Sequence, residues 1–317
     1  MGAQKLVVAG GGVLGSQIAY QAAYKGFDVT IWLRSDASIG RTQPKLDRLL
    51  GIYLQTLEGL KPLCGSSSPF FPHGLVDSLT DLTPEAIDAL KVRAQEAYDG
   101  LVLTTDMAAA VADADFVIES VAEDPESKVA FYTALAPPLP EKTVIATNSS
   151  TMLPSAFAQY TGRPEKYLAM HFANEIWKNN TSEVMGHAGT SQEAFDAIVQ
   201  LSLDIRMVPL KLKKEQPGYL LNSLLIPLLN AGQSLYVNGV ADYEDIDAAW
   251  RLGTGAPAGP FQILDVVGLT TAYNISIMSP GADDPTTTQG KIVATLKERI
   301  DAGKTGVNAG EGFYTYN

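Results

Sequence analysis

A histidine and a glutamate stand near two apolar segments in the middle of the chain. His171 lies at the end of the apolar run 167–172, and Glu183 follows twelve residues later in the stretch SEVM. A histidine at a strand end with a carboxylate nearby is a candidate acid–base pair, because imidazole titrates near neutral pH and a carboxylate can orient it. The other two histidines have weaker contexts: His73 lies in a Ser/Pro/Gly-rich break, and His187 has no comparable neighbour.

A glycine-rich turn near the start of the chain predicts a second kind of chemistry. The apolar run 5–9 leads into GGGVLG, and small apolar residues at helical spacing follow. In the order strand, G-x-G-x-x-G, helix, the glycines allow a tight turn, a close approach to a pyrophosphate and close packing of the helix on the strand. The alternative is a glycine-rich turn in another kind of α/β domain. The residues expected at the pyrophosphate are Gly10, Gly12, Val13, Leu14 and Gly15.

The end of the second predicted strand, residues 29–33, bears on which dinucleotide binds. NAD sites place an Asp or Glu about twenty residues beyond the glycines to hold the ribose 2′-hydroxyl, and Leu33 stands at that position here. Arg34 and Ser35 follow directly, and a guanidinium fork and a hydroxyl both suit a 2′-phosphate. We therefore favour NADP over NAD as the cofactor. The alternative is a solvated Arg–Ser turn with Asp36 on the ribose.

Apolar runs and helical patterns alternate over the first two thirds of the chain. Apolar segments at 116–121, 143–146 and 167–172 follow the two N-terminal strands. This alternation predicts a Rossmann-type doubly wound parallel sheet, an α/β fold whose ligands bind at the carboxyl ends of the strands. Two helical patterns joined by a Ser/Pro/Gly-rich break predict a helical hairpin inserted at about 40–100.

The composition changes after residue 210. The run KLKKEQPG ends in Pro217 and Gly218, which is typical of a domain boundary. Helical patterns dominate the remainder of the chain. We therefore predict a dinucleotide-binding domain over residues 1–210 and an all-helical C-terminal domain for substrate binding and dimerisation over residues 211–317.

Charge and cysteine content narrow the class of protein. The 317 residues carry a net charge of −12, which opposes nucleic acid or an anionic membrane as a partner. The single cysteine, Cys64, excludes an internal disulfide framework and fits a reducing compartment. No signal-peptide pattern precedes the glycines, and no apolar run is long enough to span a bilayer. We expect a soluble, cytoplasmic protein with a small-molecule substrate and no metal.

Several motifs occur in a characteristic order along nearly the whole chain. They are IESVAEDPESK, TNSST, MHFAN, SEVM, PGYLLNSLLIPLL, GAPAGPFQILDVVGL and GKTGVNAGEGFYTY. Together with the glycine turn, they make the chain resemble the 3-hydroxyacyl-CoA dehydrogenase family, and TNSST, HFAN, NNTSEVMG and GTGAPAGPF resemble its diketoreductase branch. The resemblance implies hydride transfer between a nicotinamide cofactor and a secondary alcohol carbon, in a homodimer formed through the C-terminal helical domain.

By the same resemblance, the functional positions of the family fall on matching residue types in this chain. His171 is expected to be the general acid/base and Glu183 its partner carboxylate, while Ser150 and Asn222 bind the reacting oxygen. Because these residue types are all present, the resemblance implies an active enzyme. Further residues are expected on the cofactor side, Glu123, Lys128 and Asn148, and on the substrate side, Asn174 and Glu175.

Departures from the family pattern bear on the substrate. The family segment HFFNP reads HFANE here, with Ala173 for an aromatic residue and Glu175 for proline. The hairpin that carries basic CoA contacts in the fatty-acyl enzymes has few lysines here, and Leu33 replaces the acidic residue of their NAD site. We therefore predict hydride transfer at the 3-oxo/3-hydroxy carbon of a small substrate, a diketo ester or a short 3-hydroxy acid derivative.

Two other functions stay open. The first is a short-chain (S)-3-hydroxyacyl-CoA dehydrogenase acting on 3-hydroxybutyryl-CoA, in which Lys45, Arg48 and Lys61 would hold the CoA phosphates. The second is a cofactor-binding structural protein like the lens crystallin relative. The intact set of expected catalytic residues argues against this last function.

Overall fold

The computed structural model describes residues 3–316 and divides the chain into two compact units, the second of which begins at Leu221. The predicted boundary after residue 210 falls inside strand β8 (Val208–Leu212), which pairs with β7 (Thr181–Met185). Because β8 completes the sheet, the first unit extends past the predicted boundary to Leu220.

The first unit is built on an eight-stranded sheet of order β3-β2-β1-β4-β5-β6-β7-β8. The first six strands pair in parallel, which confirms the predicted Rossmann-type α/β fold. The sequence did not predict β7 and β8: β7 runs antiparallel to β6, and β8 runs parallel to β7. The six parallel strands are β1 (Lys5–Ala9), β2 (Asp28–Trp32), β3 (Val102–Thr104), β4 (Phe116–Glu119), β5 (Val144–Thr147) and β6 (Tyr167–Phe172).

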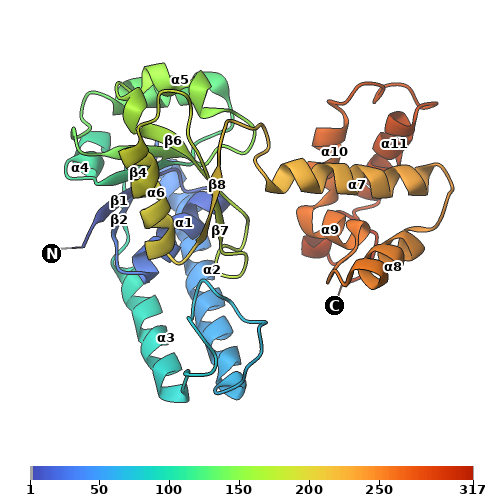
Figure 1. The fold of residues 1–317 in the computed structure, drawn as a ribbon, viewed down its shortest axis with the longest axis horizontal. Coiled ribbons are helices and arrows are strands. Elements are labelled where there is room, and N and C mark those ends of the chain that lie inside the picture. The colour runs from blue at the N-terminus through green and yellow to red at the C-terminus, as the bar shows by residue number, and fades with distance from the viewer. Residues whose placement is uncertain (1–2, 317) are drawn as a thin grey trace. The chain divides into compact units, whose positions relative to one another are not determined.

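Helices cover both faces of this sheet (Figure 1). Leu6 and Val8 of β1 belong to the hydrophobic core under α1, α2, α3 and α6, whereas Val7 and Ala9 belong to the core under α4 and α5. Successive residues of a strand point to opposite faces, so a strand buried on both faces is apolar throughout. The helices are α1 (Val13–Tyr24), α2 (Asp36–Leu60), α3 (Pro84–Asp99), α4 (Met107–Val111), α5 (Pro125–Leu135) and α6 (Gln192–Asp204).

Helices α2 and α3 form a hairpin that projects beyond the sheet (Figure 1). The apolar face of α2 is buried at Leu49, Tyr53 and Leu57, spaced four residues apart along the helix. Thr83 caps α3, and its hydroxyl accepts a hydrogen bond from the Ala86 N–H at 3.2 Å. The hairpin is therefore an ordered extension of the first unit.

The second unit consists of α7 (Leu221–Val237), α8 (Tyr243–Thr254), α9 (Pro260–Val267), α10 (Leu269–Ser276) and α11 (Thr288–Asp301). Its helical content confirms the predicted all-α C-terminal part. The buried Asp265 carboxylate accepts hydrogen bonds from the backbone N–H groups of Phe313 and Tyr314, which anchors the C-terminal tail on the helices. No helix among residues 3–316 is long and apolar enough to cross a membrane.

Candidate active site

The glycine turn follows β1 and opens α1, as the cofactor prediction requires. Gly10 has φ +120°, and a Cβ there would lie 2.3 Å from the Ser120 carbonyl oxygen. A Cβ on Gly15 would lie 2.2 Å from the Gly10 carbonyl oxygen, so both positions need glycine for close packing. A Cβ on Gly12 would meet no atom within 4 Å, which leaves its outer side open to a ligand. Val13, at the start of α1, is 63% exposed, and Leu14 packs against the core.

The N-terminus of α2 lies beside this turn. Thr42 of α2 donates a hydrogen bond from its hydroxyl to the Gly11 carbonyl at 3.2 Å. Arg34 is exposed, and Ser35 is the N-cap residue of α2, with its hydroxyl 3.0 Å from that of Ser38. Leu33 is 3% exposed and packs in the core, so the position of the usual ribose-binding acid carries a buried apolar side chain.

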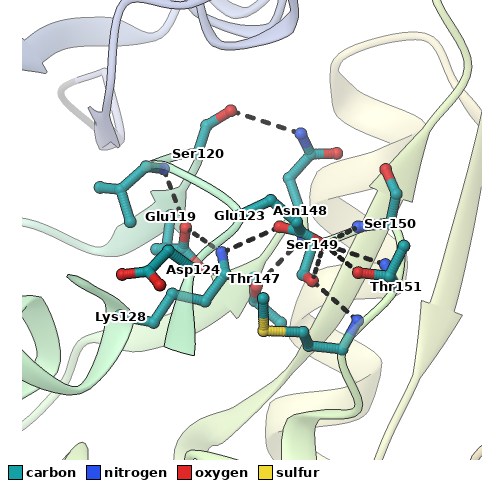
Figure 2. Close-up of polar contacts among 12 residues, drawn as sticks. Glu119, Ser120, Glu123, Asp124, Lys128, Thr147, Asn148, Ser149, Ser150 and Thr151 are labelled. Carbon is teal, nitrogen blue, oxygen red and sulfur yellow. Dashed lines mark hydrogen bonds and ion pairs between the residues drawn. The ribbon is translucent and has the colours of Figure 1, made fainter. Parts of the chain in front are cut away.

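A fully buried carboxylate, Glu119, ends β4. Its Oε1 accepts from Lys128 Nζ at 2.7 Å and from the Val121 N–H at 2.8 Å. Its Oε2 accepts from the Tyr132 hydroxyl at 2.8 Å and from the Thr147 hydroxyl at 2.6 Å. Burial, followed by the charge of Glu119, raises the pKa of Tyr132, which keeps this hydroxyl protonated as a donor. Glu119 therefore ties together β4, β5 and α5, with each oxygen held by two donors. Figure 2 shows Glu119 with Lys128 and Thr147.

Glu123 fixes the turn that follows β5. Its Oε1 accepts from the Ser149 hydroxyl at 2.5 Å, from the Ser150 N–H at 3.0 Å, and from both the N–H and the hydroxyl of Thr151 at 3.0 and 2.9 Å (Figure 2). Its Oε2 lies 3.4 Å from Lys128 Nζ. Burial raises the pKa of Glu123, but the bond from Ser149 and the charge of Lys128 outweigh it and leave the pKa below its usual value.

Two residues predicted on the cofactor side are thus engaged inside the protein. Lys128 is 1% exposed and its ammonium contacts both Glu119 and Glu123. Asn148 accepts from the Phe172 N–H at 3.2 Å and donates to the Ser120 hydroxyl at 3.3 Å. Direct contacts of Glu123, Lys128 and Asn148 with a cofactor stay a prediction, while their role in holding the strand ends is visible in the structure.

The predicted acid–base pair forms between two neighbouring strands. In the antiparallel register of β6 and β7, His171 lies directly opposite Glu183, so their side chains share one face of the sheet. His171 Nδ1 is 2.8 Å from Glu183 Oε2, and its Nε2 is 3.1 Å from Ser150 Oγ. A carboxylate only accepts, so the neutral imidazole carries its proton on Nδ1 and accepts from the Ser150 hydroxyl at Nε2. His171 and Glu183 are 5% and 3% exposed, which keeps this pair out of bulk water.

The segment at the end of the first unit completes the surroundings of this pair and was not predicted. The Tyr219 ring stacks on the imidazole of His171, with the ring centroids 4.5 Å apart and the planes 10° from parallel. Its hydroxyl donates to the Ser149 carbonyl at 2.7 Å, and the next N–H, of Leu220, donates to Glu183 Oε1 at 2.8 Å. An aromatic residue directly after a Pro–Gly pair is the sequence signal that marks this position.

The residues predicted on the substrate side follow β6. Asn174 and Glu175 are exposed, and Glu175 has φ +58°, a left-handed conformation that residues with a side chain rarely adopt. The Gln17 side chain of α1 holds this bend by accepting from the Glu175 N–H at 2.8 Å. The Glu175 carboxylate lies 3.4 Å from Lys178 Nζ. The bend thus presents a carboxylate to solvent four residues after His171.

Asn222 is the one predicted catalytic residue outside the first unit. It lies in the first turn of α7 and is half-buried. Its predicted contact with the reacting oxygen stays a prediction. Within the described residues 3–316, no group of three or more His, Cys, Asp and Glu side chains is arranged to hold a metal ion.

The fold and this arrangement define a Rossmann-type α/β protein with a glycine turn after β1 and a histidine–carboxylate pair between β6 and β7. Residues 77–216 match the NAD binding domain of 3-hydroxyacyl-CoA dehydrogenase, and residues 218–316 match the C-terminal domain of the same enzyme. The chain belongs to the 3-hydroxyacyl-CoA dehydrogenase family. It is therefore an oxidoreductase of CH–OH groups with a nicotinamide cofactor.

Two curated relatives and one solved structure show what the chain is similar to. A 3-hydroxybutyryl-CoA dehydrogenase of Clostridioides difficile is 30% identical over 99% of both chains. The mitochondrial hydroxyacyl-coenzyme A dehydrogenase of Homo sapiens is 28% identical over 98% of this chain and 90% of its own length. A solved diketoreductase, described for dual catalysis of dicarbonyl compounds, is 44% identical over the full length of both chains, with a TM-score of 0.84. These likenesses confirm the family and the similarity to diketoreductase that the motifs predicted.

Proposed function

We propose that the protein transfers a hydride between a nicotinamide cofactor and the 3-oxo/3-hydroxy carbon of a small substrate, with His171 as the general acid/base. The observation that carries this proposal is the double engagement of His171, whose Nδ1 faces Glu183 and whose Nε2 faces Ser150. This geometry fixes the tautomer, with the proton of the neutral ring on Nδ1 toward Glu183. Nε2, on the side away from the carboxylate, is then the nitrogen that exchanges a proton with the substrate.

The glycine turn supports the binding of a dinucleotide. The open side of Gly12 admits a pyrophosphate, and the first N–H groups of α1 have no partner within the helix and suit its charge. When bound, the cofactor supplies or accepts the hydride. Val13 and Leu14, the first two residues of α1, would lie beside the bound dinucleotide.

The protein residues have distinct roles in the proposed reaction. During reduction, His171 Nε2 gives a proton to the carbonyl oxygen, and during oxidation it takes that proton from the hydroxyl. Glu183 holds the ring and stabilises the imidazolium form. Ser150, whose hydroxyl lies 3.1 Å from Nε2, hydrogen-bonds the reacting oxygen, and Asn222 is proposed as a second donor to it.

We favour NADP over NAD as the cofactor. The exposed Arg34 and the hydroxyl of Ser35 supply groups for a 2′-phosphate, and the buried Leu33 supplies no carboxylate for a ribose hydroxyl. The matched NAD binding domain of the family weighs toward NAD, with Asp36 on the ribose as the competing arrangement. A comparison of the two cofactors decides between these arrangements.

We propose a substrate without a CoA group, such as a diketo ester. Two of the three basic residues that would hold CoA phosphates have partners already: Lys61 Nζ lies 3.1 Å from Glu58 and 2.8 Å from Asp88, and the Lys45 ammonium donates to the Arg41 carbonyl. The similarity to diketoreductase points the same way. The alternative substrate, a short (S)-3-hydroxyacyl-CoA, is supported by the similarity to 3-hydroxybutyryl-CoA dehydrogenase.

The test is a set of initial rates for oxidation of NADPH and NADH, each with acetoacetyl-CoA and with a 3,5-dioxo ester. We expect the highest kcat/KM with NADPH and the ester, and a loss of about 10²–10⁴-fold in His171→Gln. A preference for the thioester, together with a KM for it that rises in Lys61→Ala, would establish the alternative substrate. Tight dinucleotide binding without turnover of either substrate would instead favour the crystallin-like function.

We also propose that the protein is a cytoplasmic homodimer that associates through its second unit. Four apolar side chains of this unit are largely exposed: Leu224 by 75%, Leu252 by 85%, Val266 by 70% and Met278 by 76%. Exposed apolar side chains in such number favour burial against a partner. Light scattering on the purified protein should give twice the 33.8 kDa mass of the chain, and cell fractionation tests the location.

A further inference from the structure

The last residues of the first unit form a bend with two successive left-handed residues. Gly218 has φ +77° and Tyr219 has φ +55°. Glycine adopts such a conformation freely, but a tyrosine does so only where surrounding contacts hold it. The Tyr219 N–H donates to the Gln216 carbonyl at 3.0 Å, which closes the bend locally. Unfavourable backbone conformations of this kind concentrate at functional sites.

The side chain of Tyr219 joins the two groups that must stay aligned for proton transfer. Its ring lies nearly parallel on the imidazole of His171, and its hydroxyl donates to the Ser149 carbonyl at 2.7 Å. Ser149 directly precedes Ser150, whose hydroxyl faces His171 Nε2. The phenol ring is 1% exposed, and its burial raises the pKa of Tyr219, so the hydroxyl stays protonated as a donor.

The backbone next to Tyr219 contacts the carboxylate of the His171–Glu183 pair. The Leu220 N–H donates to Glu183 Oε1, while Oε2 of that carboxylate faces His171 Nδ1. The bend therefore contacts the imidazole through a ring, the carboxylate through an N–H and, through a hydroxyl, the turn at residues 149–151 after β5, the serine turn. A hydrogen bond to Glu183 alone would leave the imidazole free to tilt about that bond. A parallel ring at van der Waals distance removes that freedom.

We infer that Tyr219 is a positioning residue that holds the imidazole of His171 in line with Ser150 and shields one ring face from water. This inference rests on the proposed function, because it assigns a role within the same site. The phenol ring sets the tilt of the imidazole. The hydroxyl, through its bond to the Ser149 carbonyl, keeps the serine turn at a fixed distance from the imidazole. Neither group exchanges a proton with the substrate.

The first experiment observes the histidine ring directly, in the absence of substrate. The chain has three histidines, so labelled histidine gives three sets of ring signals, and the His171→Gln variant identifies one set. Protons above an aromatic face resonate upfield, so the His171 ring protons should move downfield in Tyr219→Leu and stay in place in Tyr219→Phe. The signals of His73 and His187 serve as internal controls and should not change. Unchanged His171 signals in Tyr219→Leu would overturn the stacking.

The second experiment measures kcat and KM for the preferred substrate. Because a misplaced group costs up to about a hundredfold, Tyr219→Leu should lower kcat by about ten- to a hundredfold, with little change in the cofactor KM. Loss of one net hydrogen bond should make Tyr219→Phe about fivefold slower. The control Tyr98→Phe removes a hydroxyl that bonds Asp47 in the hairpin, and it should keep wild-type kcat. Wild-type kcat in Tyr219→Leu would overturn the positioning role. If no substrate is turned over, the proposed function fails, while the ring signals still test the stacking.

Discussion

Glu119 and Glu183 are two buried carboxylates in the same sheet with different surroundings. Glu119, at the end of β4, is 0% exposed and accepts from an ammonium, a backbone N–H and two hydroxyls. Glu183, in β7, is 3% exposed and has the imidazole of His171 on one oxygen and the Leu220 N–H on the other. One carboxylate contacts groups that hold the strand ends together, and the other contacts the imidazole that is proposed as the general acid/base.

The difference shows how one residue type can serve structure in one place and chemistry in another. Four fixed donors around Glu119 compensate its desolvation and lock three elements together. At Glu183 the carboxylate lies 2.8 Å from Nδ1 of the imidazole that is proposed to exchange a proton with the substrate. We therefore expect substitutions at Glu183 to act on the rate and substitutions at Glu119 to act on stability.

The largest expected effect belongs to Glu183→Gln. An amide nitrogen toward His171 Nδ1 would favour the tautomer with the proton on Nε2, which cannot accept a proton from the substrate. We expect kcat for alcohol oxidation to fall by about 10³–10⁴-fold. Steady-state kinetics with the preferred substrate measure the effect on the rate, and the melting temperature measures the effect on stability.

A matched control for this variant is Glu141→Gln, which removes an exposed carboxylate from the same unit. It should have wild-type kcat. A Glu183→Gln enzyme within tenfold of wild type would show that Glu183 does not set the state of His171. The proposed difference between the two buried carboxylates would then no longer include a catalytic role for Glu183.

The next largest effect is expected for Glu119→Gln, on stability. The amide nitrogen would face donors at either oxygen position, and the buried Lys128 would lose its charged partner at 2.7 Å and keep only the Glu123 carboxylate at 3.4 Å. Removing one partner of a buried ion pair costs about 3–5 kcal/mol in the free energy of unfolding. Urea unfolding followed by Trp32 and Trp177 fluorescence in a Trp250→Phe background reports on the first unit.

The control for Glu119→Gln is again Glu141→Gln, which should unfold like the parent. We expect kcat per folded molecule to stay within about tenfold of the parent, since Glu119 has no contact with His171 or Ser150 among the hydrogen bonds of the described residues. Loss of activity without loss of stability would contradict a structural role for Glu119.

The sequence predicted the parts of this site that depend on local pattern. The glycine turn follows from three glycines between a strand and a helix, and the position of His171 follows from the end of an apolar run. The carboxylate network did not follow, because Glu119 reads as a polar residue in a strand until Lys128, Tyr132 and Thr147 are brought to it by the fold. Burial of this kind depends on contacts between distant segments.

Two structural reasons explain the remaining differences between the predicted and the observed structure. Strands β7 and β8 read TSEVM and VPLKL, and their polar and charged residues and the proline of β8 interrupt the apolar pattern by which strands such as β1 are recognised. The sequence names His171 and Glu183 as a candidate pair, but the antiparallel register of β6 and β7 that brings them together is not specified by sequence spacing alone. The first unit extends beyond residue 210 for the same reason, since the sequence does not predict β8 as part of the sheet.

A smaller effect is expected when both charges of the buried pair are removed. In Glu119→Gln with Lys128→Met, no buried ammonium is left without its partner. Replacing a buried ion pair by neutral residues costs less than breaking it, so we expect the double variant to recover about 1–2 kcal/mol relative to Glu119→Gln. A double-mutant cycle by urea unfolding measures this coupling. A double variant less stable than the single one would place the main function of Lys128 at Glu123.

The smallest expected effect concerns Glu123, whose side chain is 37% exposed and shares Lys128 with Glu119. Its pKa is lowered in the folded protein, because the bonds from the serine turn and the Lys128 charge outweigh burial. A lowered pKa adds stability above the unfolded value of about 4.3, and this stability is lost as the pH falls through the folded value. Glu123→Gln should therefore be less stable than wild type at pH 7, by about 1 kcal/mol or less after solvent screening, and the difference should shrink below about pH 4.

Unfolding curves between pH 3 and 7, at about 0.1 M salt, measure this difference in stability. A difference that stays constant over this range would mean that the charge of Glu123 does not stabilise the serine turn.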